Sequence, residues 1–191
     1  MKENYMDKKA FQLITWNINE KDKNDITIKS KVFDDIEQMP KEGIDAFPIA
    51  IGLNPSNKTG FNEDETNLYL KDKIKNEFNS SGYILTNLCP KIEPDSRKIR
   101  KQDFDEKHIE KVIALIDSHV NSKIVIFWGK TGNKYLNKKY IKNMKKLKNK
   151  LETRQKNNLL YYTCANEEFI HPGRCKDNYS IKEILNMSIF D

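Results

Sequence analysis

The sequence predicts an α/β fold: a three-layer α/β/α sandwich around a mainly parallel sheet of four strands. After residue 48, strand-like and helix-like segments alternate four times, which is typical of parallel strands joined by crossover helices. The strand candidate 124–128 is apolar throughout, as expected when helices cover both faces. The length of 191 residues suits one domain, with a peripheral hairpin and short helix in residues 1–47 and an α/β core in residues 48–188.

Strand candidates are runs rich in apolar and β-branched residues between turn signals. The first two form the predicted N-terminal hairpin, and a short helix around Val32, Phe33 and Ile36 follows them. The remaining four are the predicted core strands. The six candidates are residues 11–16, 26–28, 49–52, 83–88, 124–128 and 159–164.

Helix candidates are segments whose apolar residues recur at helical spacing. Leu70, Ile74 and Phe78 give one stripe, after a capping-box-like pair at Asn62 and Glu65. Ser180 and Glu183 have the same spacing and predict a final helix. Two further stripes are Ile109, Val112, Ile113 and Ile116, and Ile141, Met144, Leu147 and Leu151.

Residues 49–56 read Ile-Ala-Ile-Gly-Leu-Asn-Pro-Ser, a buried strand that stops at a tight loop. Gly52 permits close backbone approach, and Pro55 biases Asn54 toward an extended conformation. The Asn54 side chain is thus presented at the carboxyl end of a strand, where open α/β sheets bind ligands. The segment is either a site loop or only a turn.

Two further polar residues follow strands: Asn87 ends the second core strand, and His171 lies in the loop after the last one. The carboxyl ends of parallel strands emerge on the same side of a sheet. The sequence therefore predicts that Asn54, Asn87 and His171 line one pocket. Individually, Asn87 could be a turn residue and His171 a loop cap.

Gly129-Lys130-Thr131-Gly132 follows the strand candidate 124–128. The phosphate-binding loop of nucleotide hydrolases needs a glycine five residues before the Gly-Lys-Thr, and position 124 is isoleucine, so that motif is rejected. What remains is a glycine loop between a strand and a helix, in which backbone amides and Lys130 could hold one phosphate.

Positive charge is concentrated in one segment. The net charge is +6 and the sequence pI is about 9.0, which favours a polyanionic partner. Residues 129–156 contain eleven Lys or Arg and one acidic residue, so the segment carries +10 and the rest of the chain −4. The alternative is a solvated helix face without a ligand, which lysine-rich chains commonly carry.

Cysteine spacing and hydropathy exclude several classes of protein. The three cysteines, Cys89, Cys164 and Cys175, lack the spacing of a disulfide framework or zinc site. We expect no metal, no cofactor and a reducing cytoplasmic location. No apolar run reaches the ~18 residues of a membrane span, and the N-terminus lacks a signal-length apolar core, so a membrane partner is not expected.

The order of these loops resembles an uncharacterised bacterial and phage family with a Leu-Asn-Pro-Ser signature, domain of unknown function 1643. The similarity spans about residues 48–185. Its segments are Gly52-Leu53-Asn54-Pro55-Ser56, Asp64-Glu65-Thr66, Thr86-Asn87-Leu88, Trp128-Gly129 and His171-Pro172.

More distantly, the layout is similar to the uracil-DNA glycosylase superfamily. Its mismatch-specific branch has a Gly-Ile-Asn-Pro-Gly loop whose asparagine positions the attacking water, which implies that role for Asn54. The resemblance further implies that Asn87 reads the base edge, that His171 lies by the base carbonyl, and that Phe61 stacks on the base. A base in duplex DNA would have to be flipped out, a cost that basic and aromatic contacts must offset, and Lys130, Lys134 and Arg174 flank the proposed cleft for that purpose. The remaining predicted binding residues are Gly52, Ser56 and Gly129.

Three functions stay open at this point. The first is a glycosylase-like hydrolase acting on the N-glycosidic bond of a base in DNA or a nucleotide; the chemistry needs a donor at the base carbonyl and a group that holds water. The second is a non-catalytic protein that binds a nucleotide, modified base, nucleic acid or partner protein, for which phage–host conflict and phage defence are a setting. The third is a phosphate-handling hydrolase that uses the Gly129 loop.

Overall fold

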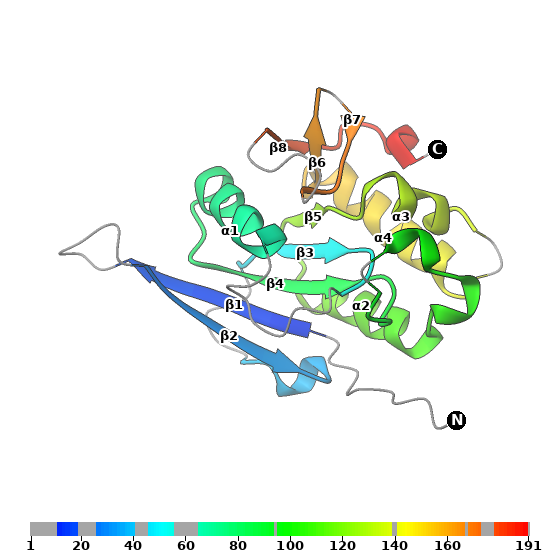
Figure 1. Cartoon of the computed structure of the whole chain (residues 1–191), viewed down its shortest axis with the longest axis horizontal. Coiled ribbons are helices and arrows are strands. Elements are labelled where there is room, and N and C mark those ends of the chain that lie inside the picture. The colour runs from blue at the N-terminus through cyan, green and yellow to red at the C-terminus, as the bar shows by residue number, and fades with distance from the viewer. Residues whose placement is uncertain are drawn as a thin grey trace.

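The computed structural model describes residues 11–18, 26–40, 46–55, 65–93, 95–138, 141–166, 168–172 and 178–190. They form one eight-stranded mixed sheet with helices on both faces (Figure 1). The strands are β1 (Phe11–Ile18), β2 (Ile26–Phe33), β3 (Ile49–Gly52), β4 (Gly82–Asn87), β5 (Ile124–Ile126), β6 (Leu160–Ala165), β7 (Glu168–Phe169) and β8 (Ser180–Glu183). The α-helices are α1 (Glu65–Phe78), α2 (Glu106–Ser118), α3 (Gly129–Leu136) and α4 (Met144–Lys156).

The centre of the sheet is parallel, in the order β4-β3-β5-β6. Ile49 of β3 pairs with Ile84 of β4 and with Ile124 of β5, and β5 pairs in parallel with β6. These are the four core strands that the sequence predicts, and the α/β class is confirmed. The prediction of a mainly parallel sheet of four strands is wrong, because antiparallel strands extend both edges.

The N-terminal hairpin forms one of these edges. β1 and β2 pair antiparallel from Phe11↔Phe33 to Ile18↔Ile26, and β1 also pairs antiparallel with β4. The hairpin is therefore continuous with the main sheet. The short helix predicted to begin near Val32 is smaller than expected, because Val32 and Phe33 continue β2 and only the 3-10 turn Ile36–Gln38 follows.

The C-terminal edge differs most from the prediction. Residues 180–183 form strand β8, which pairs antiparallel with β6, and not a capped helix. Ile181 is buried between exposed Ser180 and Lys182, and this alternation with period two is that of a strand. The Ser180–Glu183 spacing imitates a capping box, but pairing with β6 and burial of Ile181 decide the structure.

Alternate residues of the parallel strands pack into two separate cores. Ile49 and Ile51 belong to the core that α2, α3 and α4 cover, whereas Ala50 belongs to the core under Leu70 and Ile74 of α1. Every residue of β3 and β5 is buried, which explains their uninterrupted apolar sequences. Figure 1 shows α1 on one side of the sheet and α2 and α4 on the other.

Helix α2 is capped at both ends. The Asp105 side chain accepts from Lys107 N at its start. At its end, the buried Arg154 of α4 donates to the carbonyls of Ile116, Val120 and His119, the last at 3.0 Å. Burial lowers the pKa of the Arg154 guanidinium. Arg154 therefore satisfies carbonyls that a helix end leaves without partners.

Candidate functional site

Four residues form a row along the carboxyl edge of the parallel strands. Asn87 ends β4, Gly52 ends β3, Phe127 follows β5, and His171 follows β7, which folds back on β6. Gly52 and Asn87 pair in register, and Phe127 N donates to Ile51 O at 3.0 Å. We call Asn87, Gly52, Phe127 and His171 the edge row. Its order is the spatial order of the strands, although the residues are far apart in sequence.

Gly52 joins two members of the row because it has no side chain. A Cβ at this position would lie 2.5 Å from Asn87 Oδ1 and 2.7 Å from Phe127 Cζ. Both distances are shorter than real Cβ contacts, so the amide and the phenyl ring close over the glycine backbone. The sequence-based prediction that Gly52 permits close approach is confirmed, and the approaching groups are two side chains of this chain.

His108 of α2 fixes the backbone at Asn87. Its Nε2 lies 2.7 Å from Asn87 O, and because a carbonyl only accepts, this nitrogen carries the proton and donates. His108 is buried, with 6% of its surface exposed. The hydrogen bond engages only the backbone of Asn87. The Asn87 side chain is half-buried and lies on the α1 side of the sheet, beside Phe127.

His171 is positioned by β6 and by Phe127. Ile170 N donates to Thr163 O at 3.0 Å, and Thr163 Oγ1 donates to Ile170 O, so two hydrogen bonds tie the residue before His171 to β6. The His171 and Phe127 rings have centroids 5.8 Å apart and are tilted by 51°. The half-buried imidazole is thus held at the end of the edge row.

The expected glycine loop is the first turn of α3. Gly129 begins the helix with φ +66°, a left-handed conformation that favours glycine, and a Cβ there would lie 3.4 Å from His171 N. At Gly132 a Cβ would lie 2.2 Å from Trp128 Cγ, so the indole covers this glycine. Gly129 is therefore beside His171, and Gly132 has a packing role.

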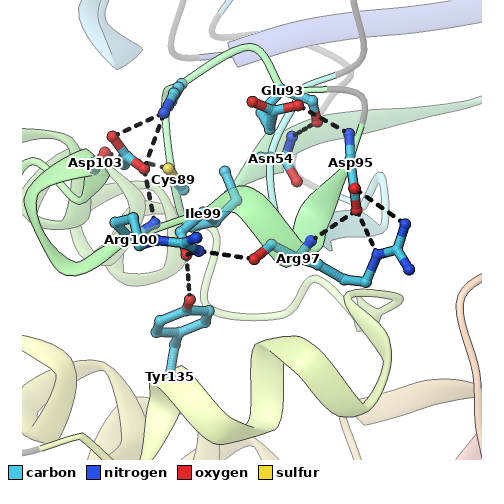
Figure 2. A network of polar contacts seen from close by, with 10 residues as sticks. Asn54, Cys89, Glu93, Asp95, Arg97, Ile99, Arg100, Asp103 and Tyr135 are labelled. Atoms are coloured by element: carbon cyan, nitrogen blue, oxygen red, sulfur yellow. Dashed lines mark hydrogen bonds and ion pairs between the residues drawn. The ribbon is translucent and has the colours of Figure 1, made fainter.

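Asn54 is engaged with a different loop. Its Nδ2 donates to Glu93 O at 2.6 Å (Figure 2). The same nitrogen donates to Pro55 O at 3.1 Å. In the described part of the chain, the hydrogen bonds of its side chain run to the neighbouring Pro55 and to the β4–α2 loop, and not to Asn87 or His171. The structure therefore brings Asn87 and His171 into one row, whereas Asn54 fixes the loop beside it.

Cys89 lies just beyond the edge row and is inert. Cys89 N donates to Leu53 O at 2.8 Å, which extends the pairing of β3 and β4, and Sγ donates to Asp103 O at 3.1 Å. Burial raises the pKa of the Cys89 thiol to about 12. A protonated, buried thiol is not a nucleophile at neutral pH.

The basic segment 129–156 divides between two places. Lys130 forms an exposed ion pair with Glu168 of β7 at 2.9 Å, and Lys134 is exposed on α3. The lysines of α4 lie on the opposite face of the sheet from Phe127, and Lys150 pairs there with Asp117 of α2 at 2.6 Å. Most of the concentrated charge is thus remote from the edge row.

Three predicted binding residues, Ser56, Phe61 and Arg174, lie outside the described residues. Among the residues that the structure does describe, no group of three His, Cys, Asp or Glu side chains is arranged to hold a metal ion. None of the described helices is both long and apolar enough to cross a membrane.

Sequence reasoning missed Phe127 and His108. Phe127 lies in the apolar run that predicts a strand, and nothing in such a run separates a residue that supports a site from one that fills the core. His108 offered a signal, because it lies one turn before Val112 on the apolar stripe of α2, and a histidine on a buried face needs a polar partner.

These features define an α/β protein with a candidate polar site at the carboxyl edge of its parallel strands. The family model described as "Protein of unknown function (DUF1643)" matches residues 41–172, and the chain belongs to this family. The matched region contains Asn54, the whole edge row and Gly129. No curated protein and no solved structure matches the chain.

Proposed function

We propose that this protein is uracil-DNA-glycosylase-like and hydrolyses the N-glycosidic bond between a nucleobase and its sugar. The observation that carries the proposal is the edge row: an amide and an imidazole project from the carboxyl edge of one sheet, joined through Gly52 and Phe127. The negative charge that develops on the leaving base needs a hydrogen-bond donor. Recognition of the base needs a group that both donates and accepts hydrogen bonds.

Asn87 is the residue proposed to read the base. Its carboxamide offers a donor and an acceptor to a Watson–Crick edge. The hydrogen bond from His108 holds its backbone carbonyl, and Gly52 lets its side chain lie close to the sheet. A recognition group with few accessible orientations loses little entropy when it binds a base.

His171 is the proposed donor to the base carbonyl. When the glycosidic bond breaks, its electron pair stays with the departing base, and a hydrogen bond to the base oxygen becomes stronger as that charge develops. The contact with Phe127 and the two hydrogen bonds between the preceding Ile170 and Thr163 restrict where the imidazole lies. A preorganised donor requires little rearrangement during the reaction.

Asn54 is proposed to position the attacking water through its side-chain oxygen. Its Nδ2 is used by Glu93 O and Pro55 O, so the carboxamide has a defined orientation and Oδ1 is its accepting end. A water that donates to Oδ1 directs its oxygen lone pair elsewhere, toward the sugar carbon in this proposal.

The bond from Asn54 to Glu93 also favours the second candidate, a non-catalytic protein that recognises a nucleotide, modified base or nucleic acid. In that case Asn54 only ties the loop after β3 to the loop after β4. The two candidates share Asn87 and His171 as ligand contacts and differ in the role of Asn54.

A screen of base release tests the proposal. Oligonucleotides that carry deaminated, alkylated or oxidised bases, and the corresponding nucleosides, are incubated with protein and the released base is measured by mass spectrometry. We expect release from at least one substrate, lost in His171→Ala and kept in Asn76→Ala, which removes an exposed asparagine of α1. Binding of a base-containing ligand without release by the wild type supports the non-catalytic candidate.

A further inference from the structure

The β4–α2 loop beside Asn54 is rich in basic residues. Between Lys91 and Asp103 the sequence has five basic and three acidic residues. The acidic groups serve the loop itself: Glu93 accepts from Asp95 N, and Asp103 accepts from Arg100 N and pairs with Lys91 at 3.1 Å. The loop is thus internally ordered while most of its cationic groups face solvent.

Two arginines of this loop are held in fixed positions. Asp95 accepts from Arg97 Nε at 2.9 Å and from Arg97 Nη2 at 3.1 Å, and this pairing lowers the pKa of the Asp95 carboxyl. Arg100 Nη1 donates to the carbonyls of Arg97 and Ile99, at 2.8 and 3.2 Å. Both residues are exposed, and ordered guanidinium groups bind a phosphate with a reduced entropic penalty.

The loop is attached to the site at one end and to α3 at the other. Asn54 Nδ2 holds Glu93 O, and Tyr135 Oη of α3 donates to Ile99 O at 2.7 Å (Figure 2). The rings of Phe104 and Tyr135 have centroids 4.7 Å apart. Exposed Lys134 precedes Tyr135 on the same helix. We call these exposed basic residues the basic rim: Arg97, Lys98, Arg100, Lys101 and Lys134.

We propose that the basic rim holds consecutive phosphates of a single polynucleotide strand. This inference rests on the proposed function and names its substrate class as a base within a strand, not a free nucleoside. Five cationic side chains on two elements exceed what one nucleotide monophosphate can use. Planar guanidinium groups suit phosphate oxygens, which favours nucleic acid over an acidic protein surface.

Helix α4 provides a matched control for net charge. Its residues Lys145, Lys146 and Lys156 are exposed, like Arg97, Lys98 and Arg100 of the rim. Since α4 covers the face of the sheet opposite to Phe127, replacing its three lysines by glutamine removes the same charge at a place outside both the rim and the edge row.

The test is fluorescence anisotropy of a labelled single-stranded oligonucleotide across a salt series. Wild type is compared with Arg97→Gln/Lys98→Gln/Arg100→Gln and with Lys145→Gln/Lys146→Gln/Lys156→Gln. For the rim triple variant we expect affinity reduced roughly tenfold or more and a log–log salt slope flatter by about 2, since each neutralised single-strand phosphate contributes about 0.7. The α4 triple variant should stay within about twofold of wild type.

Equal losses in the two triple variants would overturn the inference, because net charge alone would then account for binding. The inference would also be overturned if the wild type bound heparin or an acidic peptide and the rim substitutions weakened that binding as strongly as they weaken oligonucleotide binding. The rim would then be a general polyanion surface. Arg97→Lys/Arg100→Lys keeps the charge and should restore part of the affinity. Because arginine substitutions could disturb the loop, Lys98→Gln/Lys134→Gln provides a second rim variant, with an expected slope change of about 1.

The failures of the two proposals are distinguishable. Rim-dependent binding of oligonucleotides without base release on any substrate rejects the hydrolase and leaves the strand-binding rim. If the protein releases bases from free nucleosides, and the rim variants do so at the same rate, the strand-binding role of the rim is rejected and the hydrolase remains.

Discussion

The side-chain oxygen of Asn87 lies 2.5 Å from the position that a Cβ would occupy at Gly52, and Phe127 Cζ lies 2.7 Å from the same position. The end of β3 is thus the point where an amide and an aromatic ring meet. Any side chain at residue 52 would separate the members of the edge row.

Gly52→Ala should therefore damage both stability and ligand binding. The added methyl group has to displace Asn87 or Phe127, and overpacking of this kind costs about 1–3 kcal/mol. Urea unfolding measures the first effect and oligonucleotide affinity the second. Ser81→Ala, at an exposed position, serves as control. Unchanged stability and affinity in Gly52→Ala would show that the contacts at Gly52 do not constrain the site.

His108→Phe should loosen Asn87 without emptying the core. The substitution keeps an aromatic ring but removes the donor to Asn87 O, and an unsatisfied carbonyl costs about 1–3 kcal/mol. His108→Gln, which can donate, should recover part of the stability and ligand affinity. If His108→Phe and His108→Gln have equal effects on ligand affinity, His108 acts through packing and not through the hydrogen bond.

Arg154→Met should destabilise the pairing of α2 and α4. It removes the donors to three carbonyls at the end of α2, and we expect a loss of about 2–5 kcal/mol in the free energy of unfolding. Lys156→Met, on the same helix but exposed, should change it by less than about 0.5 kcal/mol. Similar effects of the two substitutions would show that the Arg154 bonds contribute little.

Cys89 should make stability fall at alkaline pH. Burial raises the pKa of its thiol from 9.0 to about 12, so between these values the folded state keeps a proton that the unfolded state releases. Folding stability then decreases as pH rises, by at most about 1.4 kcal/mol per pH unit. The stability difference between wild type and Cys89→Ala, measured by urea unfolding at pH 8 to 10.5, should shrink with pH. A constant difference would contradict the burial of Cys89.

Hydrophobic periodicity predicted most of the fold because, in most elements, the local sequence pattern agrees with the burial seen in the structure. The strands of the parallel core and helices α1, α2 and α4 fall at their predicted places, since their apolar spacing matches their burial. The strand β8 was mistaken for a helix because the cap-like Ser180 and Glu183 are local signals, whereas its pairing with β6 is a long-range contact. For the same reason the sequence did not show that the hairpin joins β4.

The site was predicted less completely. Strand ends identified Asn87, because topology alone places such a residue on the carboxyl edge. His171 was predicted in the loop after the last core strand, and the short strand β7, which folds back on β6, carries it to the same edge. The direction of the Asn54 amide depends on Glu93 O, a backbone group 39 residues away, and no local pattern encodes that contact. The association of Phe127 with Gly52 likewise arises from neighbouring strands and not from sequence proximity.

The central claim is that Asn54 acts on water while Asn87 and His171 contact the base. It is tested most directly by comparing single-turnover base release and equilibrium binding for Asn54→Ala and Asn87→Ala, on whichever oligonucleotide the screen identifies. We predict that Asn54→Ala loses at least about 100-fold in the rate of release and keeps substrate affinity within about threefold, because positioned water matters in the transition state and little in the ground state. Asn87→Ala should weaken binding itself by roughly tenfold, as expected when a bidentate contact to a base is removed. Equal losses of binding in both variants, with an unchanged rate of release for Asn54→Ala at saturating substrate, would contradict the account.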